Sequence, residues 1–564
     1  MKILPQVLVD SMPSGPVLLV VAVLFAALTL VLPLPPSLLS PVFSNQVVFD
    51  YLPFVISFAF SCILYGVIWF HHPDKATMFV ISVLFSVMYL SVWESKVPNG
   101  AFLSSAPSYA SASSLLTSSA RLSGNSVGSP GSVLIQASLA LSSALGTIGT
   151  FWIYSLLYST CIGAFVFLLA NELTGNPKIG TLASMLAVLS NPLFIDLPDS
   201  LYAERPLGTL LFIIILYLFV LSIRGNKKAT VPLVVIFASL TLSYVLDALI
   251  FIMIMLVVYC YGLFSGRRKS SFSYVGTAIL LEVCIFGSWI IYNAVTRSVI
   301  IGNFLRLLLT GVSSGNVGAH SFNLYITVSS YLGSQATVLA IIPVWWLLLV
   351  YGAGGLIWLR SLFHHRGLPT IVTLPVVLIG ISLFFLPGGA EFFRIANELS
   401  ILLSVMLVAE VSRSKPKIAM GLCVLILILV LPSVAAYYPS IGTATQYPTN
   451  FAAGDFLMRS SCQPFILTAE GIASLHNMPQ NTAQPAEPLG PSADLKYLNN
   501  SLSSFFLVPC SFLDTSQVLY ASLTYTFGLN FTRSARVMIR NTLSNADLVY
   551  SNSVTQLYIR GSAK

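Results

Sequence analysis

A short polar stretch between two apolar runs carries an unusual concentration of charge. Residues 191–219, NPLFIDLPDSLYAERPLGTLLFIIILYLF, place Asp196, Asp199, Glu204 and Arg205 within ten residues. A carboxylate acts as a general base or orients an acceptor group, and arginine binds phosphate through paired hydrogen bonds. The alternative is a solvated turn between two membrane helices, where charged residues normally collect.

Other charged residues flank apolar runs in the same way. Glu94 lies in SVWESKVP just after an apolar run, and Asp50 lies in VVFDYLP just before one. Glu391 and Arg394 lie in GGAEFFR, where Arg394 either binds a phosphate or pairs with Glu391. We expect these residues to join the 196–205 stretch only if the fold brings their loops to one side of a membrane.

Two carboxylates lie inside apolar sequence. Glu282 is in AILLEVCIFG, and Asp247 is between two apolar runs. Carboxylates inside a membrane are energetically costly and are therefore functional candidates by default. Asp247 is either intramembrane or at an external turn, in which case it joins the candidate site.

The composition excludes a soluble protein. The chain has 564 residues, 56% of them hydrophobic and only 8% charged, with a mean hydropathy of +0.87. In soluble proteins roughly a quarter of all residues are charged, so this chain has too few charged residues to cover a water-exposed surface. The basic residues behind the net charge of +8 occupy short loops between apolar runs, so we predict no nucleic-acid partner. No Gly-x-x-x-x-Gly-Lys-Ser/Thr loop occurs, which argues against an ATP-driven pump within this chain.

The apolar runs predict a multi-pass α-helical membrane protein with about 13 transmembrane helices. We place the spans at 16–34, 52–70, 76–93, 148–170, 179–196, 206–223, 231–246, 248–265, 273–293, 338–359, 368–386, 395–411 and 418–436. The pair at 231–265 is either one long tilted helix or two short helices meeting at Asp247. The first run lacks a small-residue cleavage site, so we interpret it as a retained helix.

The loops between these spans predict the orientation. With the N-terminus inside, the basic residues of alternate loops between the spans are all cytoplasmic, as the positive-inside rule requires: Lys75, Lys178, Arg224, Lys227, Lys228, Arg267, Arg268, Lys269, Arg360, Arg366, Arg413, Lys415 and Lys417. The opposite side carries two long loops, 94–147 and 294–337. Residues 131–149 and the stretch SVIIGNFLRLLLTGV within these loops resemble segments that lie along the membrane surface.

We divide the chain into a membrane domain, 1–436, and an extracytoplasmic tail, 437–564. In the tail, NFAAGDFLMRS predicts a helix, PFILTAEG and SFFLVPCSF predict strands, and DLVYSNSVTQLYIR predicts a hairpin, so we expect a small α/β domain. Asn499 and Asn530 begin glycosylation sequons, which fits an external tail. Cys462 and Cys510 are either two free thiols or an external disulfide that stabilises the fold by about 4 kcal/mol.

The order of these features resembles the GT-C membrane glycosyltransferases. The stretch from SVLIQASLALSS to GTLLFIIILYLF repeats their layout: a long first external loop, a helix ending at a short cytoplasmic turn (ANELTGNPKIG), a helix ending in Asn-Pro (LSNPLFI) and an acidic external turn. FLPGGAEFFRIANELSILL resembles their late external turn with an arginine before a membrane helix. The closing hairpin is similar to that of many archaeal members. The resemblance covers residues 76–436 in layout.

The resemblance implies a function. GT-C enzymes use a polyprenyl-phosphate sugar as donor at the outer membrane face, so the implied protein is a glycosyltransferase of the cell membrane acting on a protein or lipid acceptor. By position, the implied catalytic carboxylates are Glu94, Asp199 and Glu204. The implied substrate-binding residues are Arg205, Asp247, Glu391 and Arg394. The resemblance implies that either cationic side chains or a divalent cation such as Mg²⁺ or Mn²⁺ stabilises the phosphate leaving group; the sequence identifies no metal-ligand set and leaves the cofactor unknown.

The sequence departs from the family in two places. The first external loop has a lone Glu94, with Lys96 nearby, where the family shows paired acids. The Trp-Trp-Asp signature of oligosaccharyltransferase tails is absent, because Trp345-Trp346 lies in an apolar run with no Asp after it, which disfavours protein N-glycosylation. Two other hypotheses therefore stay open: a membrane transporter or lipid flippase, supported by Asp247 and Glu282, and a GT-C-like envelope or assembly protein without activity.

Overall fold

The structure is a computed structural model. It describes helical residues 15–32, 52–71, 74–96, 130–143, 146–190, 204–264, 275–291, 345–346, 348–364, 367–384, 393–414 and 416–444, and strand residues 465–467, 505–509, 517–522, 525–530, 546–551 and 555–560. The predicted helix NFAAGDFLMRS and the predicted surface segment SVIIGNFLRLLLTGV lie outside the described residues.

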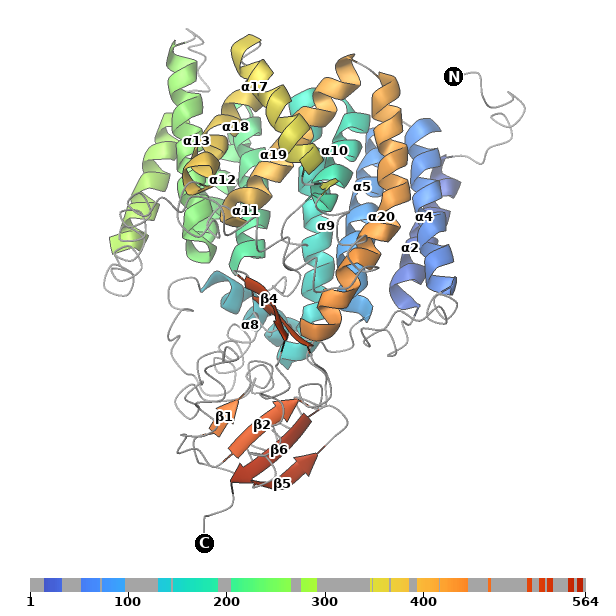
Figure 1. Cartoon of the computed structure of the whole chain (residues 1–564). Helices are drawn as coiled ribbons and strands as arrows, with labels where there is room; N and C mark the ends of the chain where they lie inside the picture. Colours follow the sequence, from blue (N-terminus) through green and yellow to red (C-terminus); the bar gives the residue numbers. More distant parts are fainter. Residues whose placement is uncertain are drawn as a thin grey trace, which may run out of the picture.

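Helices form most of the described structure (Figure 1). They are α2 (Gly15–Val31), α4 (Leu52–His71), α5 (Lys75–Lys96), α8 (Gly131–Ser143), α9 (Gly146–Thr174), α10 (Pro177–Leu189), α11 (Glu204–Ile223), η4 (Lys227–Ala229), α12 (Thr230–Ser243), α13 (Val245–Phe264), η5 (Leu349–Gly354), α17 (Gly355–His364), α18 (Leu368–Phe384), α19 (Phe393–Ser414) and α20 (Pro416–Ala444). A further helix covers Val275–Ile291.

Several of these helices are long and apolar enough to cross a membrane. Among the described residues these are Pro53–His71, Ile153–Thr174, Pro206–Ile223 and Val245–Leu263, and a bent pair formed by Leu349–Phe363 and Leu368–Ile381 adds a fifth span if it is counted as one. Shorter apolar helices accompany them, including Pro177–Leu189 and Lys417–Val430. The architecture is therefore that of a helical membrane protein, and the number of 13 spans remains a prediction.

Helical residues lie within each of the predicted apolar runs. For the uncertain pair at 231–265, the structure contains two helices, α12 and α13, separated at Tyr244, whose backbone is extended (φ −152°, ψ 102°). The ring of Phe251 on α13 contacts Phe237 of α12 and also Phe212 and Phe219 of α11, with centroids 5.6–6.5 Å apart. The second helix therefore folds back beside the first, and one long tilted helix is excluded.

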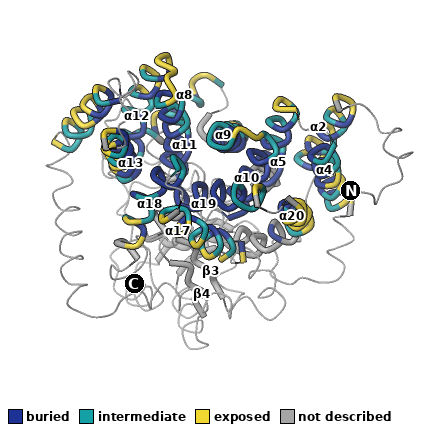
Figure 2. Tube along the Cα trace, turned by 90° about the horizontal axis from the view of Figure 1, so that it is seen from above, coloured by how far each residue is buried: buried dark blue, intermediate teal, exposed yellow. Residues whose placement is uncertain are grey.

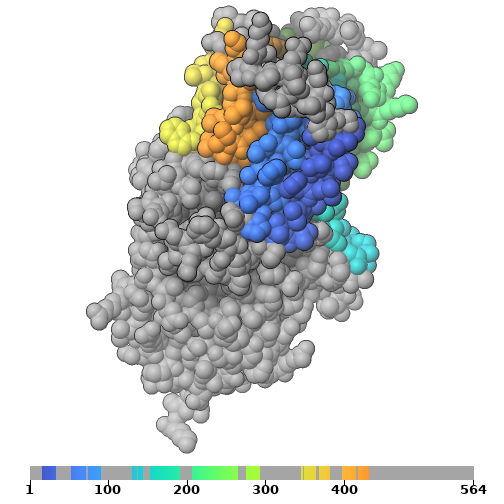
Figure 3. All heavy atoms as spheres, turned by 90° about the vertical axis from the view of Figure 1, so that its right-hand side faces the viewer, coloured from blue at the N-terminus to red at the C-terminus, as the bar shows by residue number. Residues whose placement is uncertain are grey.

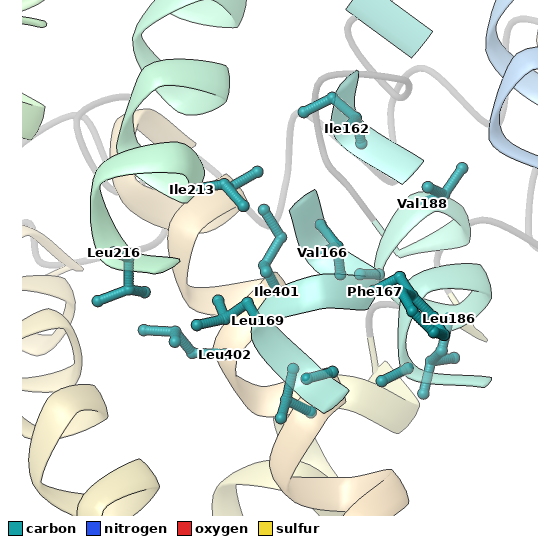
Figure 4. Packing of buried hydrophobic residues seen from close by; sticks show 14 of the residues in the cluster. Ile162, Val166, Phe167, Leu169, Leu186, Val188, Ile213, Leu216, Ile401 and Leu402 are labelled. Carbon is teal, nitrogen blue, oxygen red and sulfur yellow. The ribbon is translucent and has the colours of Figure 1, made fainter. Parts of the chain in front are cut away.

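The most deeply buried helices of the bundle are α10 and α19, which lie near its middle (Figure 2). Every residue of α10 from Ile179 to Leu189 is buried, so this short helix is enclosed by protein. Figure 4 shows apolar side chains of four helices converging there: Ile162, Val166 and Leu169 of α9, Leu186 of α10, Ile213 and Leu216 of α11, and Ile401 and Leu402 of α19.

Close helix packing at this core depends on a glycine. A Cβ at Gly163 of α9 would lie 2.8 Å from the Ser82 carbonyl oxygen and 3.1 Å from Val83 Cα, both backbone atoms of α5. The Ser184 hydroxyl of α10 donates a hydrogen bond to the Gly163 carbonyl oxygen (3.2 Å). Small residues at such crossings let membrane helices approach closely, and Gly163 joins three of them.

Two turns of similar sequence connect helices at one end of the bundle. Gly175 (φ +72°) and Gly225 (φ +98°) adopt left-handed conformations that favour glycine. The asparagine after each glycine accepts a backbone hydrogen bond: Asn176 from the Lys178 amide (2.9 Å) and Asn226 from the Lys228 amide (3.2 Å). These Gly-Asn turns reverse the chain between α9 and α10 and between α11 and α12.

Basic residues collect at this end, which we call the basic end: Lys75, Lys178, Arg224, Lys227, Lys228, Arg360, Arg413 and Lys417. Lys178 stacks over the Trp69 ring (5.2 Å to its centroid) and donates to the Phe70 carbonyl oxygen (3.1 Å), while the Trp69 indole donates to the Lys178 carbonyl oxygen (3.2 Å). Arg224 pairs with Glu172 at 2.8 Å. These contacts fix the ends of α4, α9, α10 and α11.

The opposite end, where α9, α11, α13 and α19 begin, faces the C-terminal strands, and we call it the sheet end (Figure 1). Here α8 contacts α9, α11 and α12, and Gly131 lies so close to Ser243 of α12 that a Cβ would collide with its side chain. The predicted surface segment at 131–149 is thus a helix under the bundle, followed by the start of α9.

The described tail residues form a four-stranded sheet and a separate hairpin. The sheet order is β1 (Phe465–Leu467), β2 (Phe505–Pro509), β6 (Thr555–Arg560), β5 (Ala546–Ser551), with β1 and β2 parallel and the other pairs antiparallel. β3 (Gln517–Ser522) and β4 (Tyr525–Asn530) form the hairpin. Strands occupy the three tail segments predicted to contain them, and the α/β class of the tail remains a prediction.

Figure 3 shows the flank of the bundle formed by α2, α4 and α20. There α4 packs between α2 and α20, and exposed side chains include Leu24, Ile63 and Ile428. The Thr29 and Ser57 hydroxyl groups meet at 2.9 Å across the α2–α4 contact. Polar groups therefore point between helices while apolar groups point outward, as expected for helices in lipid.

A first prediction concerns Gly163. Gly163→Ala should destabilise the protein by about 1–3 kcal/mol, because the added methyl group meets α5 backbone atoms that cannot move aside. Gly421→Ala is the matched control, since open space surrounds that helical glycine. Thermal unfolding in detergent measures both variants, and equal melting temperatures for the two would contradict the packing described here.

Candidate functional site

The first turns of α11 lie between two buried carboxylates. The Thr209 hydroxyl donates a hydrogen bond to Glu398 Oε1 of α19 at 2.7 Å. At the preceding residue, a Cβ on Gly208 would lie 2.8 Å from Asp247 Oδ2 and 2.6 Å from Tyr244 Cβ. The backbone of α11 therefore fits between the start of α13 on one side and α19 on the other.

These polar groups are removed from solvent. Thr209 and Asp247 have no exposed surface, and Glu398 is 1% exposed. Burial of a carboxyl group is unfavourable unless polar groups surround it. The hydrogen bond from Thr209 meets part of this requirement for Glu398. Burial of this acid therefore depends on the relative positions of α11 and α19.

Tyrosines from two further elements lie near the same acid. The buried Tyr158 of α9 and the half-buried Tyr351 of η5 lie within electrostatic range of the Glu398 carboxyl group. η5 is a short π-helix, a type of turn that is frequent at functional sites. A Cβ at Gly354 of η5 would lie 3.1 Å from the Leu403 carbonyl oxygen, so η5 approaches α19 closely. Four elements thus meet around one carboxylate.

α19 is buried on all sides from Asn397 to Val408, and polar residues recur among its buried side chains over several turns. Asn397, Ser400 and Ser404 are each fully buried. The Ser404 and Ser190 hydroxyl groups lie 3.4 Å apart, which joins α19 to the end of α10. An inward polar stripe on a membrane helix is typical of a functional or specificity-determining face, because lipid-facing positions are apolar.

Four of the residues predicted to act in catalysis or binding begin or end helices at the sheet end. Glu204 and Arg205 are the first two residues of α11, Arg394 is the second residue of α19, and Glu94 lies in the last turn of α5. Asp247, the fifth, lies in the first turn of α13, beside Gly208. The helices thus carry these five positions to one end of the bundle.

The other predicted site residues lie largely outside the described residues. These are Asp199 and Glu391 of the implied site, Cys462 and Cys510 of the predicted disulfide, and the sequon residue Asn499. Asn530 is the last residue of β4 and pairs with Gln517. The disulfide and the glycosylation sites remain predictions.

Glu282 lies in the middle of the helix Val275–Ile291 and is fully buried. Within the described part of the chain, neither of its carboxylate oxygens has a hydrogen-bond partner. On the same helix, Gly276 lies against the Tyr259 hydroxyl of α13, at 3.3 Å from an added Cβ. The helix that carries Glu282 thus packs on the outer side of α13, away from the Thr209–Glu398 contact on α11 and α19.

No group of three or more His, Cys, Asp or Glu side chains that could hold a metal ion occurs among the described residues. The two buried carboxylates beside α11, Asp247 and Glu398, lie on different sides of this helix. They do not form a ligand set, and the predicted Mg²⁺ or Mn²⁺ ion gains no support from them.

The sequence interpretation missed Glu398, Asn397 and Thr209. The signal for Glu398 was present, because the predicted span at 395–411 includes this carboxylate within apolar sequence. The rule that made Glu282 a candidate applies equally to Glu398. Thr209 carried no such signal, since a threonine in a membrane helix usually bonds to its own backbone, as Thr241 does with the Phe237 carbonyl oxygen.

A second prediction follows from the close approach at Gly208. Gly208→Ala should push α11 away from α13 and destabilise the protein by about 1–3 kcal/mol, because the methyl group meets Tyr244 and Asp247. Gly287→Ala is the control, since nothing lies within 4 Å of an added Cβ there. Thermal unfolding compares the two, and a Gly208→Ala protein as stable as the control would show that α11 and α13 are not in contact.

Comparison with solved structures shows that this chain shares its fold with the oligosaccharyltransferase of Archaeoglobus fulgidus. No protein-family model matches the chain, and no curated protein sequence matches it significantly. Solved structures of the oligosaccharyltransferase of Archaeoglobus fulgidus do match. The apo form has a TM-score of 0.51 and 11% identity over 79% of this chain and 70% of that one.

Two liganded forms of the same archaeal enzyme give similar values. The complex with Zn and sulfate has a TM-score of 0.51 and 14% identity over 77% of this chain and 68% of that one. The complex of this enzyme, AglB, with an inhibitory peptide and a dolichol-phosphate has a TM-score of 0.52 and 12% identity over 81% and 74%. The expected GT-C resemblance is confirmed at the level of the fold.

Proposed function

We propose that the protein is a glycosyltransferase that moves a sugar from a polyprenyl (dolichyl) phosphate to an acceptor outside the cytoplasm. One observation carries the proposal: the Thr209–Glu398 hydrogen bond sets α11 and α19 face to face one turn below Arg205 and Arg394. The shared fold with AglB supports it, because one structure of that enzyme contains a dolichol-phosphate.

Helix periodicity indicates which face of its helix each of the two arginine positions occupies. Residues four apart lie on the same face of a helix. Arg205 therefore shares the face of α11 that holds Thr209, and Arg394 shares the face of α19 that holds Glu398. Since the Thr209 hydroxyl and the Glu398 carboxyl group meet at 2.7 Å, the two arginine positions lie on facing sides of their helices, one turn nearer the sheet end.

This arrangement suits a phosphate. Guanidinium groups bind phosphate oxygens in pairs, and the amide groups at the start of a helix add a favourable dipole. During transfer the bond between the anomeric carbon and a phosphate oxygen breaks, and the electron pair leaves with the phosphate. Arg205 and Arg394 would stabilise the charge that develops on that oxygen.

Carboxylates at the same end complete the proposed chemistry. A new bond forms between the anomeric carbon and the nucleophilic atom of the acceptor, whose proton passes to a carboxylate. We assign this role to Glu94, Asp199 and Glu204 as a group, with Asp247 and Glu391 among the substrate-binding residues. The Mg²⁺ or Mn²⁺ ion implied by the resemblance remains a prediction without assigned ligands.

The charge distribution sets the proposed orientation. Basic residues of membrane proteins gather on the cytoplasmic side, so the basic end faces the cytoplasm and the sheet end faces outward. The protein is then a multi-pass protein of the cell membrane with its tail outside. The acceptor is a protein or a lipid: AglB has been solved tethered to an acceptor peptide, whereas the Trp-Trp-Asp signature is absent from this chain.

Buried Glu282 favours one other function, a transporter or lipid flippase. Transporters place coupling carboxylates near the midplane of the membrane, and Glu282 occupies the middle of its helix. A GT-C-like envelope or assembly protein without activity is the remaining alternative, supported by the lone Glu94 in place of paired acids.

A third prediction tests the proposed phosphate site. Arg205→Ala and Arg394→Ala should each lower sugar transfer in isolated membranes about 10²–10³-fold, the loss expected when one stabiliser of a developing charge is removed. Arg413→Ala, an exposed arginine at the basic end, is the control and should keep full activity. The measurement is transfer of radiolabelled sugar from a polyprenyl-phosphate donor.

A fourth prediction separates the glycosyltransferase from the transporter. Glu94→Gln, Asp199→Gln and Glu204→Gln should include at least one variant with transfer lowered 10²–10⁴-fold, as for loss of a general base. Full transfer by all three and by both arginine variants would overturn the site. If the wild type transfers no sugar but transports a substrate, and Glu282→Gln abolishes that transport, the protein would instead be a transporter.

A further inference from the structure

We infer that Thr209 and Glu398 are positioning residues whose hydrogen bond holds the starts of α11 and α19 at the separation that a phosphate between Arg205 and Arg394 requires. The inference rests on the proposed function for its ligand, a phosphorylated lipid. The bond itself is a property of the fold, joining a hydroxyl of one helix to a carboxylate of another at 2.7 Å.

The direct contact between α11 and α19 is small. The principal neighbours of α11 are α9 and α12, and those of α19 are α10 and α18. The Thr209–Glu398 hydrogen bond lies within the smaller α11–α19 contact, so we expect it to contribute to the separation of the two helices there.

The bond lies close enough along both helices to affect the positions of the two arginines. Arg205 and Arg394 each lie four residues before a bonded residue, a rise of about 6 Å along each helix. A change in separation at the bond therefore appears at both arginines. A phosphate that contacts two guanidinium groups is sensitive to such a change, because paired hydrogen bonds depend on geometry.

Gly208 helps to fix the rotation of α11 about its own axis. Its close approach to Tyr244 and Asp247 holds α11 against α13 on one side, while Thr209 holds it to α19 on the other. Two adjacent residues thus fix the rotation of α11 about its axis. Rotation would carry Arg205 away from Arg394, so both contacts serve the same alignment.

The experiment compares variants that differ in one hydroxyl group. Thr209→Val keeps the shape of the side chain and removes the donor, and Thr209→Ser keeps the donor. Thr241→Val is the matched control, because Thr241 is equally buried and donates only within its own helix, to the Phe237 carbonyl oxygen (3.0 Å). Glu398→Gln keeps an acceptor oxygen, whereas Glu398→Ala removes it.

The kinetic readout separates positioning from general stability. For Thr209→Val we expect the KM for the polyprenyl-phosphate donor to rise about three- to tenfold, the range for loss of one hydrogen bond between membrane helices. The KM for the acceptor should not change, Thr209→Ser should restore the donor KM, and Thr241→Val should match the wild type. Glu398→Gln should affect the donor KM less than Glu398→Ala.

A second readout does not need catalysis. In a background without the seven native cysteines, Arg205→Cys and Arg394→Cys together should be joined by a short bifunctional thiol reagent. Adding Thr209→Val should lower the yield of the cross-link, and adding Thr241→Val should not. If the wild type transfers no sugar, this yield still tests the inference, so the two failures are distinguishable.

Unchanged donor KM and unchanged cross-linking in Thr209→Val would overturn the positioning role. So would equal effects of Thr209→Val and Thr241→Val on either measurement, because those would reflect loss of any buried hydroxyl.

Discussion

The arrangement of the sheet end depends on a single buried contact, the hydrogen bond between Thr209 of α11 and Glu398 of α19. A carboxyl group in an apolar helix bundle is tolerated only where polar groups surround it. The Thr209 hydroxyl supplies one such group. Because α11 and α19 must meet for this bond to form, the buried acid favours the pairing of these two helices at the end of the bundle that carries the proposed site.

The two ends of the bundle are built from different contacts. At the basic end, short Gly-Asn turns, the Lys178–Trp69 contact and the Arg224–Glu172 pair anchor the helices. At the sheet end, helices begin or end with charged residues, and the close approaches at Gly208 and Gly131 leave little space between them. A basic end with anchored helices and a sheet end rich in helix starts are compatible with the proposed enzyme, which would bind a lipid phosphate at the sheet end.

The sequence predicted the helices well because each depends on local composition: apolar runs gave their positions, and Gly175-Asn176 gives a turn by backbone conformation alone. The separation of α12 from α13 at Tyr244 was left open, since neither glycine nor proline marks it. The site was harder. Arg205, Arg394 and Glu94 stood out as charges beside apolar runs, but their shared location depends on helix directions. The pairing of Thr209 with Glu398, 189 positions apart, depends on packing that no local pattern contains.

The central claim is that α11 and α19 present Arg205 and Arg394 to one phosphate. An experimental structure of the protein in lipid nanodiscs with a polyprenyl phosphate tests it most directly. The account predicts a phosphate between the first turns of these helices, within hydrogen-bond distance of both guanidinium groups, with the Thr209–Glu398 contact intact below it. A phosphate bound at the basic end beside Lys178 or Arg224, or two arginines that point into separate spaces, would contradict it.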